Sequence, residues 1–265
     1  RLGFYSYDTW LQLRDITPAK KRAFVNYILE HASILWFSEC VGKWDMCVSL
    51  LARNIGHFYK MFNQIQEKFP DVIRDYNISF NVSGTWYSRT HLVSESARPE
   101  PLWHWESDLE LVKTDKIDRR ILAVLAEDAR TPTTEISGRI GVDPATVARR
   151  IKRLEGRKVI QGYHGMSEGR IPYLIRYEVM LKFVNMTREK EKAVEEFCRS
   201  NPNIYLYIRA VGRWDADLVM EVKNVEHLQS ILSEMREIFP ETIVDYEPIP
   251  ITREHRQNFF PGSLL

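Results

Sequence analysis

Val41-Gly42-Lys43-Trp44-Asp45 returns 170 residues later as Val211-Gly212-Arg213-Trp214-Asp215. The same offset, without a gap, pairs Phe69-Pro70 with Phe239-Pro240, Asp75-Tyr76 with Asp245-Tyr246, Asn54 with Asn224 and His57 with His227. Identities that are spread so widely at one constant offset indicate a duplicated domain.

Each copy has the pattern of a β-α-β-β-α-β unit. The first strand of each copy alternates apolar and polar residues, which predicts a strand with one buried face. The residues on that face are Tyr5, Tyr7, Thr9, Leu11 and Leu13 in the first copy, and Ile175, Tyr177, Val179, Leu181 and Phe183 in the second. This element order is that of a ferredoxin-like split βαβ sandwich, present twice.

The helices of the two copies are marked by their ends. Thr17-Pro18 and Thr187 are expected to cap the first helix of each copy, with Ala23, Tyr27, Ala193 and Phe197 on its apolar stripe. The second helix has apolar residues at spacings of four, three and four: Phe58, Phe62, Ile65 and Phe69, then Leu228, Leu232, Met235 and Phe239. A Phe-Pro pair ends each second helix, because proline does not continue a helix.

The composition is that of an ordinary globular protein. Of the 265 residues, 44% are hydrophobic and 28% are charged, and no apolar run is long enough to cross a membrane. No signal peptide is visible, and the three cysteines show neither a disulfide framework nor zinc-ligand spacing. We expect a cytoplasmic protein, associated with the nucleoid if it binds DNA.

Between the two copies lies a segment with a helix-turn-helix pattern. Helices are predicted from about Lys116 to Glu127, from a Thr133 cap to Ile140, and from an Asp143 cap with Pro144 at the first helical position. Gly141 supplies the turn between the second and third helices. A short helix, a glycine turn and a longer basic helix are typical of DNA-binding domains.

The charge distribution agrees with this interpretation. Residues 113–160 contain twelve Lys and Arg against seven Asp and Glu, a net charge of +5, whereas the whole chain has only +1. The remainder therefore carries −4. A basic segment in an acidic chain is what a localised contact with a polyanion requires.

The third helix is expected to enter the major groove. At about 100° per residue, Val147, Ile151 and Leu154 share one face, which should pack on the other helices. Ala145, Thr146 and Arg149 lie opposite, near the helix N-terminus, and are predicted to contact bases. We predict phosphate contacts for Arg150, Lys152 and Arg153, and a further DNA contact for Thr133. The alternative is that these arginines form only a solvated helical face.

Several stretches of this segment resemble the Lrp/AsnC family of bacterial and archaeal regulators. They are Lys116-Ile117-Asp118-Arg119-Arg120-Ile121-Leu122, Gly141-Val142-Asp143-Pro144-Ala145-Thr146-Val147, Arg150-Ile151-Lys152-Arg153-Leu154-Glu155 and Val159-Ile160-Gln161-Gly162-Tyr163. The resemblance spans nearly all of residues 115–250, and its sensor half occurs again over residues 1–82. It implies sequence-specific binding to double-stranded DNA and pairing of sensor domains.

The resemblance also implies an amino acid or other small metabolite bound near a Gly-x-x-Asp turn. Carried over, the effector-binding residues are Gly42, Lys43, Trp44, Asp45, Gly212, Arg213, Trp214 and Asp215. The alternative is a tight hairpin turn with no ligand, because Gly and Asp suit any such turn. The strict repeat also predicts another helix-turn-helix ahead of Arg1.

The sequence therefore predicts an α+β protein: two ferredoxin-like sensor domains flanking a three-helix, winged-type helix-turn-helix. The expected boundaries are 1–83 for the first sensor, 84–113 for a linker, 114–162 for the helix-turn-helix and 163–265 for the second sensor with its tail. In the linker, Trp103-His104-Trp105 is expected to pack on a neighbouring domain or to dock a partner. The two sensor copies are expected to pair within one chain, between chains, or both.

Two other functions stay open at this point. Siroheme decarboxylases resemble the same two-domain plan, and the recurrence of His57 and His227 keeps an enzyme in view. No carboxylate pair, nucleophile triad or metal cluster supports catalysis, so we assign no catalytic residue, metal or cofactor. The third hypothesis is an architectural DNA-binding protein of low sequence preference.

Overall fold

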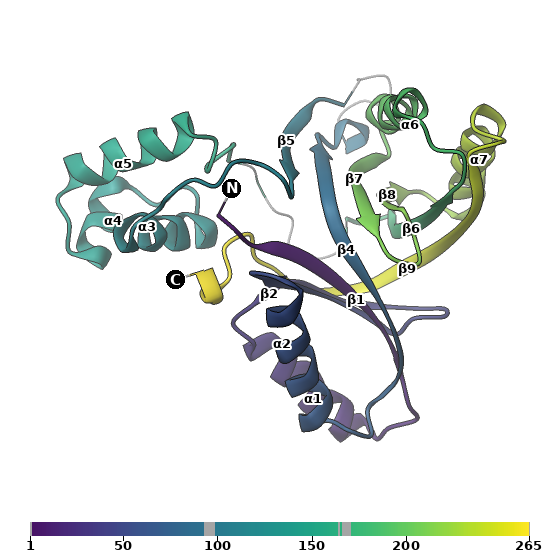
Figure 1. Cartoon of the computed structure of the whole chain (residues 1–265), viewed down its shortest axis with the longest axis horizontal. Coiled ribbons are helices and arrows are strands. Elements are labelled where there is room, and N and C mark those ends of the chain that lie inside the picture. The colour runs from purple at the N-terminus through teal and green to yellow at the C-terminus, as the bar shows by residue number, and fades with distance from the viewer. Residues whose placement is uncertain (1, 93–98, 164, 166–170, 265) are drawn as a thin grey trace.

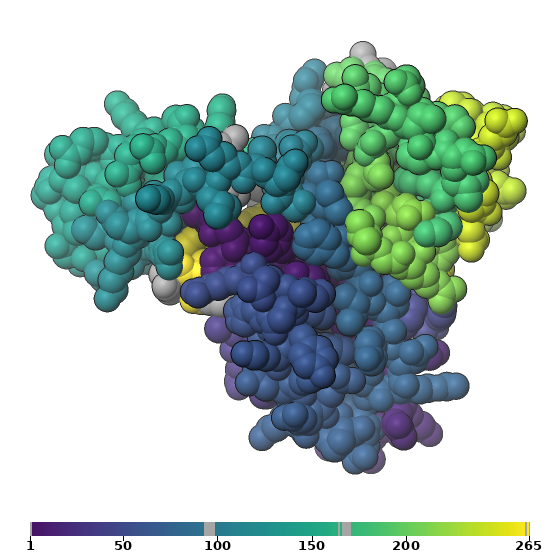
Figure 2. All heavy atoms as spheres, in the orientation of Figure 1, coloured from purple at the N-terminus to yellow at the C-terminus, as the bar shows by residue number. Residues whose placement is uncertain are grey.

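The computed structural model describes residues 2–92, 99–163, 165 and 171–264. Two α/β lobes share one sheet, and a smaller helical lobe projects from them (Figures 1 and 2). The helical lobe lies on the left in both views, and the two ends of the chain lie at its junction with the sheet. No helix among these residues is long and apolar enough to cross a membrane.

The two α/β lobes repeat each other element by element. The first contains β1 (Tyr5–Leu13), α1 (Pro18–Glu30), β2 (Ile34–Cys40), β3 (Met46–Ala52), α2 (Ile55–Lys68) and β4 (Ile73–Tyr87). The second contains β6 (Ile175–Phe183), α6 (Arg188–Ser200), β7 (Ile204–Val211), β8 (Ala216–Val222), α7 (Val225–Ile238) and β9 (Ile243–Gln257). The bounds differ by 170 throughout, except that β7 ends one residue later than β2 would predict. The duplicated ferredoxin-like fold is confirmed.

The helix ends follow the capping chemistry that the sequence predicts. The Thr17 and Thr187 hydroxyls each accept a hydrogen bond from a backbone N–H three residues on, at 3.3 Å. Phe69 and Phe239 end the second helices. The predicted stripe of the first helices is half right: Phe197 and Tyr27 pack on their cores, whereas Ala23 and Ala193 are exposed. The residues that α1 and α6 bury are Phe24, Val25, Ile28, Val194, Phe197 and Cys198.

The strands of the two copies close into a barrel. The order is β1-β3-β2-β9-β6-β8-β7-β4, and β4 returns to pair with β1. The junctions between the copies are the β2–β9 and β4–β7 pairs, both antiparallel and both within this one chain. Because every neighbouring pair is antiparallel, equivalent strands of the two copies run in the same direction. The copies are therefore related by a pseudo-twofold axis along the barrel.

Closure gives every barrel strand a second buried face, where the sequence analysis expected only one. The outer face carries Tyr7 and Leu11 in one copy and Tyr177 and Leu181 in the other, packed under the helices of their own copy. The opposite face points into the barrel. One end of the lumen is filled by a cluster drawn from both copies: Trp10, Cys40, Trp44, Cys47, Met180, Trp214, Ile249 and Ile251.

Part of the segment predicted as a linker belongs to the sheet. β4 runs past residue 83 to Tyr87, and β5 (Pro101–Glu106) pairs with it antiparallel. A short 3₁₀ turn, η1 (Thr90–Leu92), lies between them. Trp103 stacks on Trp86 with ring centroids 5.4 Å apart, so the aromatic run packs on the sensor pair. The Ser94–Arg98 part of the expected linker lies outside the described residues.

The middle segment forms α3 (Lys116–Glu127), α4 (Thr133–Ile140) and α5 (Pro144–Gly156). Ile121, Ile136, Ile140 and Val147 form its own core. A second cluster joins Leu122 and Leu154 to Phe260 and Leu264 of the C-terminal segment, where η2 (Gly262–Leu264) lies. The helical lobe is thus attached to the sensor pair by apolar contact. Residues 157–163, which follow α5, form turns and irregular structure rather than strands.

Candidate nucleic-acid interface

The start of α5 is fixed by a side-chain cap. The Thr146 backbone N–H donates to Asp143 Oδ1 at 2.9 Å, and Pro144 occupies the first helical position. The bond from Thr146 holds the pKa of Asp143 below its usual value. Gly141 precedes this cap with φ of 71°, a left-handed conformation that closes α4 and suits glycine. The turn chemistry predicted for the helix-turn-helix is confirmed.

The two faces of α5 separate as the helical spacing predicts. Val147 and Leu154 are buried against the other helices, and Ile151 is half-buried. On the opposite side Ala145, Arg149 and Lys152 are exposed, and Thr146 is half-buried. The structure therefore brings the predicted base-contacting residues together on one open face near the helix N-terminus. Arg149 Nη2 lies 3.5 Å from Thr146 Oγ1, which aligns the two side chains along that face.

Two of the predicted phosphate ligands are already engaged inside the domain. Arg150 Nη1 lies 2.6 Å from Asp115 Oδ2 and 2.9 Å from Asp118 Oδ1, and Arg153 pairs with the other oxygen of Asp118. The Asp118 side chain is 1% exposed, and Asp115 caps α3. The hydrogen bond that the Arg150 guanidinium donates to Asp115 raises the pKa of Arg150 above its usual value. These ion pairs fasten α5 to the start of α3, a role that sequence spacing did not reveal.

Thr133 is half-buried at the first position of α4. The prediction that it caps this helix is wrong, because the N-cap residue is Pro132 and no side chain makes the cap bond. Proline has a fixed φ near the value needed before a helix, so it can start α4 without a capping side chain. The hydroxyl of Thr133 is consequently not used as a cap, and its contact with DNA stays a prediction.

The two Gly-x-x-Asp turns have roles within the barrel. Trp44 and Trp214 are 1% and 3% exposed and enter the lumen cluster. Asp45 Oδ2 accepts the Leu13 N–H at 2.7 Å, and Asp215 Oδ2 accepts the Phe183 N–H at 2.8 Å. Each carboxylate thus accepts the backbone N–H of the last residue of the first strand in its own copy.

The glycines of these turns differ in what they require. Gly42 has φ of 120°, whereas a Cβ on Gly212 would come within 2.8 Å of the Ile78 carbonyl oxygen in the other copy. Lys43 and Arg213 lie over the rings of the tryptophans that follow them. Effector binding by the eight turn residues stays a prediction.

The repeated histidines close helix caps. His57 N donates to Asn54 Oδ1 at 2.9 Å, and His57 Nδ1 accepts the Arg53 N–H at 3.2 Å. His227 makes the equivalent bond to Asn224, at 2.8 Å. A reciprocal cap of this kind satisfies two backbone groups at the helix start. Their recurrence in the sequence is therefore explained by helix capping in both copies.

The sequence analysis missed a group of buried carboxyls in the barrel lumen. One oxygen from each of Asp8, Glu178 and Asp217 lies within 4.8 Å of the others, and all three residues are at most 3% exposed. Burial is the main reason that the pKa of each carboxyl is raised. By donor type they could hold a cation. One feature of the sequence could have revealed this group. Asp8 and Glu178 are acidic residues at equivalent positions of the two copies, on the strand face that was expected to meet solvent.

Comparison with known proteins shows sequence similarity to transcriptional regulators. Residues 115–155 match the AsnC-type helix-turn-helix domain. An HTH-type transcriptional regulator of Pyrococcus horikoshii is 33% identical over 125 residues, which are 46% of this chain and 77% of that protein. The proline dehydrogenase transcriptional activator of Rhodobacter capsulatus is 30% identical over 48% of this chain and 82% of its own length.

A solved structure extends the likeness to the whole chain. The siroheme decarboxylase NirDL superposes with a TM-score of 0.65 over 99% of this chain and 77% of that one, at 12% identity. At that identity the likeness shows only that the fold is shared. The sequence matches to the helix-turn-helix and to the archaeal regulator are closer, and by them this chain belongs to the Lrp/AsnC family of transcriptional regulators.

Proposed function

We propose that this protein is a sequence-specific DNA-binding transcriptional regulator that reads its operator with α5. The observation that carries the proposal is the open face of Ala145, Thr146 and Arg149 beside the capped N-terminus of that helix. Residues at this end of a recognition helix reach base edges first. The names of the related regulators support the same function.

The pairing of charges refines the roles within α5. Arg149 is the residue best placed to pair with guanine O6 and N7, and Thr146 or Ala145 would touch a thymine methyl group. Lys152 is exposed on the same side and suits a phosphate. Arg150 and Arg153 would reach a phosphate only from within their ion pairs with Asp118, so their larger contribution is to hold α5 in place. Thr133 is a further candidate at the start of α4.

We also infer that the chain acts as a regulator rather than as a siroheme decarboxylase. The histidines that suggested an enzyme take part in helix caps, which gives them a sufficient structural reason to recur. The β2–β9 and β4–β7 pairs would take the place of the two-chain sensor dimer. We expect the protein to work in the cytoplasm on the nucleoid, where its DNA lies.

The test is selection from a pool of random DNA duplexes at two salt concentrations. Wild type should enrich one motif. Arg149→Ala should relax the preference at one base pair, at a cost of about 1–3 kcal/mol. Lys152→Ala should weaken binding to all sequences alike and reduce the salt slope by about 1. Arg22→Ala is the matched control, because Arg22 is an exposed arginine on α1, outside the helix-turn-helix.

Each result separates one reading from another. Salt-sensitive binding without enrichment would favour an architectural protein. Enrichment that survives Arg149→Ala unchanged would remove α5 as the reading element. Absence of binding at low salt would contradict the proposal for this chain.

A further inference from the structure

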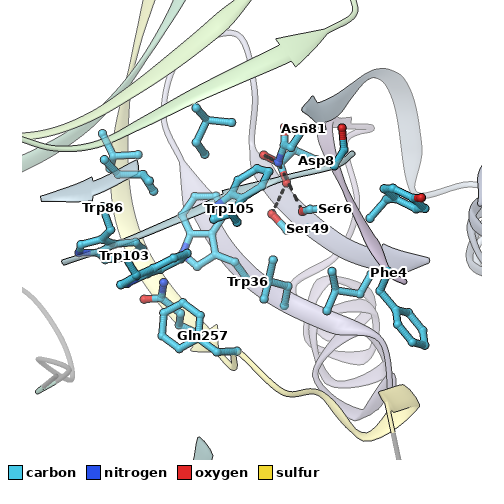
Figure 3. A pocket seen from close by; sticks show the side chains of 18 of the residues that line it. Phe4, Ser6, Asp8, Trp36, Ser49, Asn81, Trp86, Trp103, Trp105 and Gln257 are labelled. Carbon is cyan, nitrogen blue, oxygen red and sulfur yellow. Dashed lines mark hydrogen bonds between the residues drawn. The ribbon is translucent and has the colours of Figure 1, made fainter. Parts of the chain in front are cut away.

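The end of the barrel opposite the lumen cluster holds a cavity of about 260 Å³. Its walls are largely aromatic: Trp36, Trp86, Trp103, Trp105, Tyr205 and Phe259 (Figure 3). Asp8, Ser6, Ser49 and Asn81 lie together on one side of Trp105 in the same view. This volume is slightly below the range of about 300–1,000 Å³ that is typical of small-ligand sites, so the ligand should be small.

The chain is shaped to hold Trp105 in this wall. Trp105 on β5 lies opposite Gly84 on β4, and a Cβ on Gly84 would meet the indole ring at 2.6 Å. Only glycine lets the indole ring come this close to the strand. In the second copy, Glu254 takes the place of Gly84. This aromatic wall is therefore present on one side of the pseudo-twofold axis only.

The described residues that line the cavity include acidic side chains but no basic ones. Asp8, Glu106, Glu178 and Glu254 line it, and the described residues of the lining include no Lys, Arg or His. Two of these carboxylates have basic partners outside the lining. Glu254 lies 2.7 Å from Arg176, and Glu106 lies 3.0 Å from His104. Glu254 also accepts the Trp36 indole N–H at 2.9 Å.

Asp8 has hydrogen-bond donors, but several buried oxygens around it have none. Asp8 is satisfied by Ser49 and by the Asn81 amide at 2.8 Å. Glu178 Oε2, both oxygens of Asp217 and Asn81 Oδ1 have no hydrogen-bond partner in the structure, although each of these residues is at least 97% buried. All of these atoms accept hydrogen bonds when the carboxyls are ionised. Buried acceptors without donors are rare in folded proteins, and a ligand that donates would satisfy them.

We propose that this cavity binds an organic ammonium ion that has an apolar or aromatic body and no carboxylate. The ammonium group would donate to Glu178 and the Asn81 amide oxygen, with Asp8 and Asp217 close by. Its body would lie against Trp36, Trp86 and Trp105, whose ring faces attract cations. One carboxyl would lose its proton when the cation enters, because burial raises the pKa of Asp8, Glu178 and Asp217 in the unliganded protein.

The lining argues against other ligands. An amino acid would bring its carboxylate beside four carboxyl groups, and the part of the wall that the structure describes has no cation to receive it. A bare divalent ion would fit the three carboxyls but would leave the aromatic walls without a function. The proposal concerns a ligand site in the barrel and does not depend on the DNA-binding function.

The test uses matched probes on the whole chain. Phenethylammonium, phenethyl alcohol and phenylalanine share one aromatic body and differ in the head group. Binding is followed by tryptophan fluorescence, because four of the seven tryptophans line the cavity, and by the shift in melting temperature. We expect saturable binding of phenethylammonium at least about tenfold tighter than either other probe, equivalent to about 1.4 kcal/mol.

Variants then assign the site. Glu178→Gln should reduce the preference for ammonium over alcohol to near onefold. Glu67→Gln, an exposed carboxyl on α2, should leave it unchanged. Gly84→Ala should weaken all three probes by displacing Trp105. Manganese ion is the fourth probe, and it should not compete with phenethylammonium.

Three results would overturn the proposal. Equal affinity for phenethylammonium and phenethyl alcohol would show an apolar pocket with no use for its carboxyls. Absence of saturable binding by wild type would remove the site, whatever the variants do. Displacement of phenethylammonium by manganese, with tighter binding of the metal, would make this an inorganic cation site.

Discussion

The two sensor copies are alike where they face their own helices and different where they face each other. Under the helices, Tyr7 and Leu11 correspond to Tyr177 and Leu181, and all four are buried. In the lumen, Ser49 corresponds to Val219, Asn81 to Ile251 and Cys47 to Asp217. Each outer face must match the helices of its own copy, which repeat. The lumen is built by both copies together, so a change in one can be matched by the other.

This asymmetry explains why the polar and aromatic groups gather at one end of the barrel. Asn81 and Ser49 of the first copy supply donors to Asp8, whereas the equivalent positions in the second copy are aliphatic and leave Glu178 without them. A symmetric dimer of identical chains would have the same arrangement in both halves of the lumen. Duplication within one chain allows the two halves of the lumen to carry different side chains.

The largest expected effect tests whether the lumen is one shared core. Trp10 and Met180 are equivalent residues, both fully buried in the same cluster. Trp10→Ala should lower the free energy of unfolding by about 3–5 kcal/mol, and Met180→Ala by about 2–5 kcal/mol. Because the two sites share a cluster, the double variant should depart from additivity by at least about 0.5 kcal/mol. Urea denaturation measures all three, and additive losses would show that the two lumen faces are independent.

A smaller effect on stability is expected at a position where the two copies differ, Cys47 in the first and Asp217 in the second. Burial raises the pKa of Asp217, and repulsion from the Asp8 carboxylate raises it further. The other titratable and charged groups in this part of the lumen are Glu178, Arg176, Glu254 and Cys47. An acid whose pKa is raised by folding stabilises the fold while protonated, and this stability is lost as pH rises through the folded pKa.

Asp217→Asn should therefore stabilise the protein on the alkaline side. It should remove up to about 1.4 kcal/mol per pH unit from the slope of stability against pH. Denaturation at a series of pH values measures this. Asp245→Asn, at an exposed residue on β9, is the control. A slope that is unchanged by Asp217→Asn would mean that this carboxyl does not titrate on unfolding.

The smallest expected change in the free energy of unfolding is at equivalent helix caps, where the two copies have the same structure. The Thr17 and Thr187 caps have equal geometry, with 3.3 Å bonds to the backbone. Thr17→Ala and Thr187→Ala should each cost about 0.5–2 kcal/mol and should agree within about 0.5 kcal/mol. Thermal unfolding of the two variants is the measurement. A large difference would show that the copies differ in stability outside the lumen as well.

Sequence patterns predicted the elements of the fold because each element is set locally. The caps at Thr17, Thr187 and Asp143 and the Phe-Pro ends depend on a few neighbouring residues, and their positions agree with the structure. The one-residue error at Ala23 came from a helix with apolar residues at adjacent positions, where the burial of Phe24 decides the stripe.

Closure of the barrel could not be predicted in the same way. Alternation along β1 shows that one face is apolar, but a face carrying Ser6, Asp8 and Trp10 suits solvent as well as a polar lumen. The decisive contacts join strands more than one hundred residues apart, such as β4 and β7. The pairing of Arg150 with Asp118 was missed for the same reason, since it joins two helices that only the fold brings together.

The β2–β9 and β4–β7 junctions have a consequence for how the protein responds to its own abundance. When two separate chains form such a barrel, dilution shifts them towards monomers. Here the partner strands are tethered, so their encounter is intramolecular and its effective concentration is fixed by the connecting chain. The barrel should therefore stay closed at any dilution, and the state of its lumen should not depend on how much protein is made.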